Sequence, residues 1–382
     1  MSLPIDPAAA ARAVVWGGLA LGLAMGAVGQ STRFCVRGSI SDWVVFRGPH
    51  RLFAWVLAIA VGALGVQLLI SLGLFDPTRA VSWSDRYLWL SYLVGGALFG
   101  YGMMIAPGCP QRCLVKAGAG DLKALVTLVL LAIVALMTLR GAFAGLRVSF
   151  FDSLAVAVGS PQDLGSIFGK LVPLPAAVIR WLLVLALLGA VGTFAWRVRS
   201  RLDRTAWLAG TAVGLLVTAA FFLTGRIGFV AEHPETLEAA WLGTQSRRPE
   251  GLSFSAPLAH SLDLLTLWSD KNTVATFGVM LALGVLLGSH VSARLRGEFR
   301  VESYSNAREM RGDLGGAVLM GFGGITALGC SIGNGVTGVA MLSAGALLAV
   351  AGMVGGALLA LKLQMRRDAL DGGGVPVPSA MA

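Results

Sequence analysis

The residues of this sequence whose chemistry stands out are four cysteines and the glycines beside them. Cys109 and Cys330 each end a stretch with the pattern G-x4-G-aromatic-G-x5-G-C. One copy of this stretch starts at Gly95 and the other at Gly316. Regularly spaced glycines let apolar helices approach closely, and for Gly95, Gly316 and their neighbours we favour a packing role. The repeated pattern indicates an internal repeat with the two cysteines at its functional centre.

Each Gly-Cys step is expected to end one helix and to start another. Pro110 follows the first step and fits the first position of a new helix, which places Cys109 at the helix cap. Backbone N–H groups at a helix start favour anions and polarise a thiol. The arrangement predicts a site for a small anion with a soft atom. We assign to this site Cys109, Cys330, Gly108, Gly329, Ser331, Gly333, Asn334 and Gly335.

A third cysteine, Cys35, lies directly after the first apolar segment, between Arg33 and Arg37. The two arginines either draw an anion toward the cytoplasm or serve only as topology anchors. Thiols along one route would pass a sulfur-containing anion by successive weak hydrogen bonds, which suits passage better than one tight site. Cys113 has no counterpart in the second copy, and we interpret it as an ordinary buried cysteine.

Other classes of site do not fit the spacing of these residues. The cysteines form no C-x-x-C motif and have no matching histidine pair, so neither a zinc site nor a disulfide framework is expected. Residues 333–338 match G-x-G-x-x-G, but no predicted strand precedes them, and residues 165–171 lack the Walker spacing. We therefore expect no metal, no cofactor and no catalytic residue.

The composition indicates an all-α polytopic membrane protein that forms a single transmembrane domain over residues 1–382. Hydrophobic residues make up 56% of the chain and charged residues only 13%, with a mean hydropathy of +0.76. A soluble chain would carry about 25% charged residues. The net charge of +10 comes from arginine clusters between apolar runs, without any nucleic-acid-binding motif, so no nucleic-acid partner is expected.

Nine apolar segments are predicted to span the lipid bilayer. If the arginine clusters face inward, nineteen of the thirty lysines and arginines are cytoplasmic, the N-terminus lies outside and the C-terminus lies in the cytoplasm. The predicted spans are 13–30, 52–75, 87–107, 124–139, 173–197, 206–224, 272–290, 314–329 and 339–361.

This topology predicts two inverted four-helix repeats, at 13–139 and 206–367, because the connecting span at 173–204 reverses the direction of the second repeat. Broken or re-entrant helices at the Gly-Cys motifs would then meet near the midplane, as in transporters. In the loop 226–271, residues 258–268 are expected to form a short amphipathic helix on the membrane surface. The tail at 368–382 is expected to be disordered.

Several of these motifs resemble the YeeE/YedE family of sulfur-transport membrane proteins. The resemblance covers essentially the whole chain and is carried by Gln30-x-x-Arg33-Phe34-Cys35-x-x-Gly38, by residues 95–109, by Gly297-Glu298-Phe299-Arg300-Val301 and by 314–335 with Gly-Cys-Ser-Ile-Gly-Asn-Gly. It implies thiosulfate uptake through a pathway lined by three cysteines, which match Cys35, Cys109 and Cys330. It also implies a small cytoplasmic sulfur-carrier protein, a sulfurtransferase, that receives the sulfur.

We therefore expect a permease of the bacterial inner membrane for thiosulfate or a similar small sulfur anion, and not an enzyme. Two alternatives stay open. The first is a transporter of another sulfur or selenium species. The second is a membrane thiol-redox protein that uses Cys109 and Cys113 as a dithiol and is coupled to a cytoplasmic sulfurtransferase.

Overall fold

The computed structural model describes residues 6–157, 159–232, 238–271 and 273–370. Within these ranges, eight helices are long and apolar enough to cross a membrane, which agrees with a polytopic membrane protein. Their helical cores are α1 (Pro7–Thr32), α3 (His50–Ser71), α4 (Trp89–Ile105), α6 (Leu122–Arg140), α9 (Ala176–Val198), α10 (Arg204–Phe222), α12 (Phe277–Leu295) and α14 (Ala344–Leu370).

Shorter elements connect these helices. Two antiparallel strand pairs fasten the loops on one side: β1 (Arg86–Tyr87) with β2 (Val156–Ala157), and β3 (Phe229–Val230) with β4 (Ala240–Trp241). The short helices are α2 (Val36–Ser41), α5 (Pro110–Gly118), α7 (Ala144–Leu146), α8 (Leu164–Gly169) and α11 (Ser255–Thr266). The single helical turns are η1 (Asp42–Phe46), η2 (Pro77–Arg79), η3 (Val81–Trp83), η4 (Arg147–Phe151), η5 (Asp152–Leu154), η6 (Arg199–Arg201), η7 (Leu223–Ile227) and η8 (Gly333–Gly338).

The predicted span 314–329 differs from the other eight. It falls in α13 (Ala307–Thr326), whose first turns carry Arg308, Glu309, Arg311 and Asp313. This charge keeps α13 out of the set of apolar helices described above, so the predicted nine spans exceed the observed set by one.

Two predicted boundaries near the C-terminus also need correction. The last span begins at Ala344 rather than at 339, because the preceding residues form η8 and a tight turn. The tail predicted to be disordered from 368 is wrong at its start, since α14 continues to Leu370. Residues 371–382 lie outside the described part of the chain.

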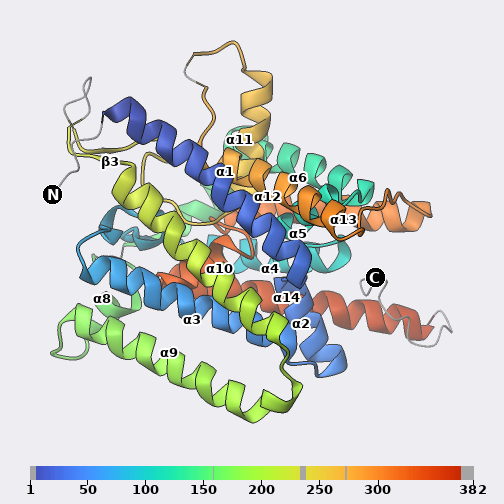
Figure 1. Cartoon of the computed structure of the whole chain (residues 1–382), viewed down its shortest axis with the longest axis horizontal. Helices are drawn as coiled ribbons and strands as arrows, with labels where there is room; N and C mark the ends of the chain where they lie inside the picture. The colour runs from blue at the N-terminus through green and yellow to red at the C-terminus, as the bar shows by residue number, and fades with distance from the viewer. Residues whose placement is uncertain (1–5, 158, 233–237, 272, 371–382) are drawn as a thin grey trace.

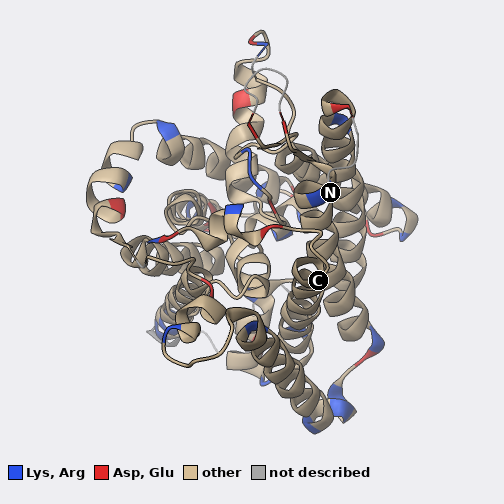
Figure 2. Cartoon of the chain, turned by 90° about the vertical axis from the view of Figure 1, so that its left-hand side faces the viewer, with Lys and Arg blue, Asp and Glu red and all other residues tan. Residues whose placement is uncertain are grey.

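The long helices pack in pairs that join the first part of the chain to the last. Helix α1 packs on α12, α3 on α10, α4 on α14 and α6 on α13, and α4 also contacts α13. Figure 1 shows α3 beside α10 and α9 at the edge of the bundle. Figure 2 shows the charged residues mainly at helix ends and in the connections between helices, while most of the bundle is uncharged.

Glycines set the closeness of these pairs. A Cβ atom added to Gly22 of α1 would lie 2.8 Å from the Cα atom of Gly284 in α12. Helices α4 and α13 approach in the same way. An added Cβ on Gly95 of α4 would lie 3.0 Å from the carbonyl oxygen of Gly323 in α13, and an added Cβ on Gly102 would lie 2.8 Å from the carbonyl oxygen of Gly316. The packing role predicted for Gly95, Gly100, Gly316 and Gly321 is confirmed, since an added Cβ at each of them would meet the backbone of a neighbouring helix or its C-cap at under 3.0 Å.

Helix α11 corrects another expectation. Its N-terminal half is buried, with Leu258 8% and Ala259 0% exposed, and it packs on α6, with further contacts to α12 and α13. Only the end of the predicted surface segment is exposed, at Leu265, Leu267 and Trp268. The start of the segment expected on the membrane surface, Leu258 and Ala259, therefore belongs to the interior.

The glycine contacts lead to a stability prediction. Gly22→Val should separate α1 from α12 and lower the free energy of unfolding by about 1–3 kcal/mol, the usual range for overpacking. Gly189→Val in α9 is the matched control, because an added Cβ there meets nothing within 4 Å. Thermal unfolding of the purified protein in detergent measures both variants. Equal effects at the two positions would contradict the close-packing interpretation.

Candidate functional site

The first break has the predicted helix start. Helix α4 ends at Ile105, and Cys109 is the N-cap of α5 with Pro110 at the first helical position. The N–H of Arg112 approaches the Cys109 sulfur without forming a hydrogen bond to it. Cys113 donates from its thiol to the Gly108 carbonyl over 3.3 Å, so its contact is internal to the break. Cys109 therefore lies at the N-terminus of α5 and is fully buried, with 0% of its surface exposed.

The second break is held by an asparagine. After α13 ends, Leu328 adopts a left-handed backbone conformation with φ 56° and the chain turns. The Asn334 amide donates to the carbonyl oxygens of Ala327 over 2.8 Å and of Gly329 over 3.1 Å. The sulfur of Cys330 accepts the N–H of Gly333 over 3.3 Å. Asn334 thus acts as a brace for the turn that presents the thiol.

Cys35 has the same local geometry as Cys330. It is the N-cap of α2, and its sulfur accepts the N–H of Gly38, three residues on, over 3.3 Å. Arg37 donates to the Met104 carbonyl over 3.0 Å, which ties α2 to the end of α4. Arg33 ends α1 in a left-handed conformation with φ 56° and is exposed.

These elements bring several of the predicted residues together. The Ser331 hydroxyl approaches the Cys109 thiol, and Cys35 and Cys330 lie near enough to act electrostatically on the same thiol. Ser331 is 0% exposed, and its hydroxyl makes no hydrogen bond to any described residue. The carbonyl of Gly335, in η8, accepts a hydrogen bond from the Trp55 indole over 2.8 Å.

A buried glutamine that the sequence reasoning missed follows the first break. Gln111 in α5 is 0% exposed, and neither amide atom of its side chain has a partner within the described residues. An added Cβ on Gly29 of α1 would lie 2.9 Å from its amide nitrogen. The signal in the sequence that could have identified it is the position of Gln111, a polar residue two positions after Cys109 at the expected helix start.

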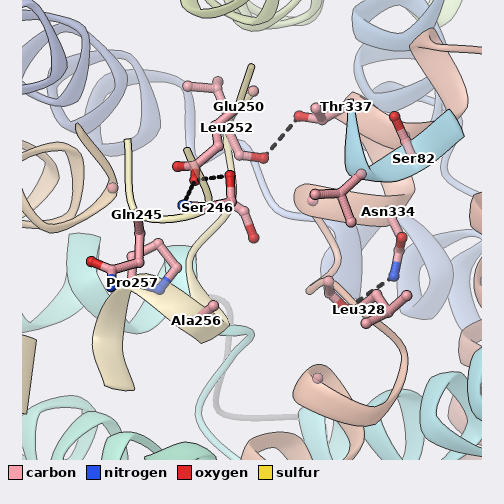
Figure 3. A pocket seen from close by; sticks show the side chains of 18 of the residues that line it. Ser82, Gln245, Ser246, Glu250, Leu252, Ala256, Pro257, Leu328, Asn334 and Thr337 are labelled. Atoms are coloured by element: carbon pink, nitrogen blue, oxygen red, sulfur yellow. Dashed lines mark hydrogen bonds between the residues drawn. The ribbon is translucent and has the colours of Figure 1, made fainter. Parts of the chain in front are cut away.

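A cavity of about 520 Å³ leads to the second break. Gly329, Gly333 and Asn334 line it, together with the loop that precedes α11. Figure 3 shows Ala256 and Pro257 of α11 on one side of the cavity and Leu328 and Asn334 on the other. Sequence reasoning missed this loop and α11 as parts of the site, because their polar residues are typical of exposed connections.

Hydrogen bonds fix the loop against the helices. Thr337 of η8 donates to the Leu252 carbonyl over 2.8 Å, and Thr224 of η7 donates to the Glu250 carbonyl over 2.7 Å. These bonds join the wall of the cavity to the segment that carries Cys330. The cavity therefore has a defined shape next to the second break.

The charged residues of the cavity are mostly neutralised. Arg140 pairs with Asp263 over 3.1 Å, and Arg147 pairs with Asp152 over 3.3 Å. The Glu250 carboxylate accepts the N–H and the hydroxyl of Ser246 over 2.8 Å and 2.6 Å. Burial raises the pKa of the Glu250 carboxyl above its ordinary value of 4.5, and the hydrogen bonds from Ser246 oppose this shift.

The described residues hold no cluster of three or more His, Cys, Asp or Glu that could bind a metal ion. Hydroxyls, amides, thiols and helix starts are the groups that the breaks and the cavity present. Such groups donate hydrogen bonds and suit an anion.

Comparison with known proteins now adds to this geometry. Residues 31–359 match the model of a protein family described as sulphur transport. The chain belongs to this family. It is 29% identical over 342 residues to the thiosulfate transporter TsuA of Escherichia coli (strain K12). The aligned region covers 86% of this chain and 89% of that protein. It is 25% identical over 350 residues to the thiosulfate transporter TsuA of Spirochaeta thermophila, with 88% and 94% covered.

Membership in the sulphur-transport family confirms the resemblance inferred from the motifs. Together with the eight apolar helices, it establishes a multi-pass membrane protein of a transporter family. The match runs from before Cys35 to beyond Cys330, so both breaks and the cavity lie inside the family's common region.

The brace at Asn334 can be tested within this framework. Asn334→Asp should lower the free energy of unfolding by about 1–3 kcal/mol, because a carboxylate cannot donate to two carbonyl oxygens and is left buried beside them. Asn306→Asp is the control, since Asn306 caps α13 by accepting the Glu309 N–H over 2.8 Å, which an aspartate also does. Thermal unfolding of the purified protein in detergent measures both variants. An unimpaired Asn334→Asp variant would show that the brace is dispensable.

Glu250 predicts a pH dependence of stability. Because the pKa of Glu250 is raised, the folded protein keeps the carboxyl proton to higher pH than the unfolded chain does. The stability that this proton contributes is full below the ordinary pKa of 4.5 and is lost as the pH rises through the pKa of the folded state. Glu250→Gln should remove this loss, so its melting temperature should fall less between acidic and neutral pH. Asp85→Asn, at an exposed loop position, is the control. Parallel pH profiles for wild type and Glu250→Gln would exclude this role.

Proposed function

We propose that this chain is a permease that takes up thiosulfate or a similar small sulfur anion across the bacterial inner membrane. Two curated relatives are thiosulfate transporters of nearly the same length. The observation that carries the proposal is the cavity of about 520 Å³ that ends at the Cys330 break and presents neutral hydrogen-bond donors. The proposal includes no catalytic step.

The proposed pathway runs from the cavity past three thiols. An anion leaves the cavity at Gly329 and Gly333, meets Cys330, passes Ser331 to Cys109 and continues to Cys35. Ser331 supports this order because its unpaired hydroxyl extends from one break toward the cysteine of the other. Neutral thiols form weak hydrogen bonds, so each site releases the anion readily to the next.

The charges at the far end of the pathway fit its direction. Arg33 and Arg37 flank Cys35, and Arg33 is exposed. With the inward assignment of the arginine clusters, these residues lie on the cytoplasmic side and attract the anion out of the last thiol site. A cytoplasmic sulfur-carrier protein would receive the sulfur on this side. The cavity, by contrast, is lined by the loops 76–86, 140–172 and 226–271, which the same assignment places outside.

The inverted repeats of this proposal are supported by the packing of the helices. If α1, α3, α4 and α6 correspond to α10, α12, α13 and α14, the contact of α1 with α12 corresponds to that of α10 with α3. The contact of α4 with α14 likewise corresponds to that of α13 with α6. The glycine contacts between α4 and α13 exchange in the same way. A pseudo-two-fold axis in the membrane plane would produce this pattern.

The same axis would make the segments after the breaks re-entrant. Helices α4 and α13 run antiparallel, so Cys109 and Cys330 follow opposite ends of their contact. Ser331 nevertheless approaches Cys109, which fits chains that turn back toward the centre after each break.

Growth of a bacterium that lacks its own sulfur uptake, with thiosulfate as the sole sulfur source, tests the proposal. Wild type should restore growth, and Cys35→Ala, Cys109→Ala and Cys330→Ala should each lower thiosulfate uptake by at least about tenfold. Cys113→Ala is the matched control, because the Cys113 thiol only bonds to Gly108. It should retain more than about half of the uptake.

Two results would contradict the proposal. Failure of well-expressed wild type on thiosulfate would reject this cargo, and growth on other sulfur or selenium anions would then identify the alternative. An equal loss in Cys109→Ala and Cys113→Ala, with Cys330→Ala unaffected, would favour a dithiol role for the first break over a three-thiol pathway.

A further inference from the structure

Two helix N-termini meet at the wall of the cavity opposite the Cys330 break. Helix α11 begins at Ser255 and α12 at Phe277. An added Cβ on Gly278 would lie 2.7 Å from the Pro257 ring, so the first turns of the two helices are in contact. Ala256, Pro257, Thr276 and Gly278 all line the cavity. The positive ends of two helix dipoles are thus directed at one place.

Two buried hydroxyls without partners lie at these helix starts. Thr276 is the N-cap of α12 and lines the cavity, yet its side chain makes no capping hydrogen bond. It is 6% exposed, and its hydroxyl has no partner within the described residues. Ser255, at the start of α11, is 1% exposed, and its hydroxyl also has no partner among them. Buried polar groups are normally paired, so the Thr276 hydroxyl, which lines the cavity, is available as a donor to a ligand.

The Ser255 hydroxyl lies against Gly324 of α13, and Ser255 is not among the residues that line the cavity. An added Cβ on Gly324, which lines the cavity, would lie 2.5 Å from this oxygen. Ser253 lies one residue before the N-cap of α11 and also lines the cavity. Its hydroxyl oxygen is 2.8 Å from an added Cβ on Gly333, and the Cys330 sulfur is 3.8 Å from that same point. The helix starts therefore lie within the reach of a small anion from the thiol.

Backbone N–H groups add further donors. The first N–H groups of any α-helix have no intrahelical acceptor. The N–H of Phe277 donates to the Gly243 carbonyl over 2.7 Å. The N–H groups that follow it in the first turn of α12, and the N–H groups of α11 before Pro257, remain as donors. The cationic side chains of the cavity, Arg140 and Arg147, are paired with carboxylates. The site is therefore rich in neutral donors, which select an oxoanion over a cation.

We propose that the first turns of α11 and α12 form the outer oxoanion-binding site of the transporter, with the Ser253 and Thr276 hydroxyls, which both line the cavity, as donors to the ligand. This inference rests on the proposed function and adds the step before Cys330. The hard oxygens of a thiosulfate-type anion face the hydroxyl and N–H donors. Its terminal sulfur then points toward Cys330, because a thiol is the softer partner.

The test compares Thr276→Val, Ser253→Ala and the double variant in two assays. The first measures KM and maximal rate of thiosulfate uptake in cells, and the second measures thiosulfate and sulfate binding to the purified protein by calorimetry. Each single variant should raise KM and weaken binding by about fivefold, the effect of one lost hydrogen bond, with the maximal rate little changed. Thr276→Ser should restore both values.

Thr127→Val is the matched control, because Thr127 is 0% exposed and its hydroxyl already donates to the Lys123 carbonyl, outside the cavity. Unchanged KM and binding in Thr276→Val and Ser253→Ala, or an equal change in Thr127→Val, would overturn the proposal. So would a loss confined to the maximal rate. If wild-type cells take up no thiosulfate but the purified protein binds an oxoanion with these mutational effects, the proposed function fails and the site stands.

Discussion

Direct backbone contact between α4 and α13 is the constraint on which the rest of the structure depends. Gly95 meets Gly323 and Gly102 meets Gly316, so the two copies of the glycine pattern lie antiparallel against each other. In a membrane there is no hydrophobic driving force between helices, and such contacts supply the van der Waals energy instead. Because each helix ends within a few residues of this contact, its register also fixes where the two breaks occur.

The chemistry of the site follows from what is left unpaired. Asn334 and the sulfurs of Cys35 and Cys330 are engaged in bonds that shape the breaks. The hydroxyls of Ser331, Ser255 and Thr276 have no such bonds within the described residues. Neutral donors in a low-dielectric interior attract an anion strongly enough to replace part of its hydration, but they lack the full charge that would trap it. Arg140 and Arg147 at the cavity are paired with carboxylates, so they too present no uncompensated charge that would trap an anion.

Much of the site could be predicted from local sequence. Proline after a Gly-Cys step fixes a helix start, and the cap position of Cys109 follows from that alone. The family membership likewise rested on long ordered motifs. Helix α11 could not be placed in this way, because its burial depends on contacts with α6, α12 and α13. Thr276 was missed because α12 begins at Phe277, whereas the hydrophobic pattern put the start of this span at 272.

The pairing of early with late helices has a mechanical consequence. Four pairs of long helices, α1 with α12, α3 with α10, α4 with α14 and α6 with α13, join the two halves of the chain through close packing. A rigid-body rocking of one half against the other would have to break all these interfaces at once, at a cost that grows with each glycine contact. The segments after the two breaks and the loop held by Thr337 and Thr224 are different, because only a few hydrogen bonds hold them and these can exchange without opening a helix interface.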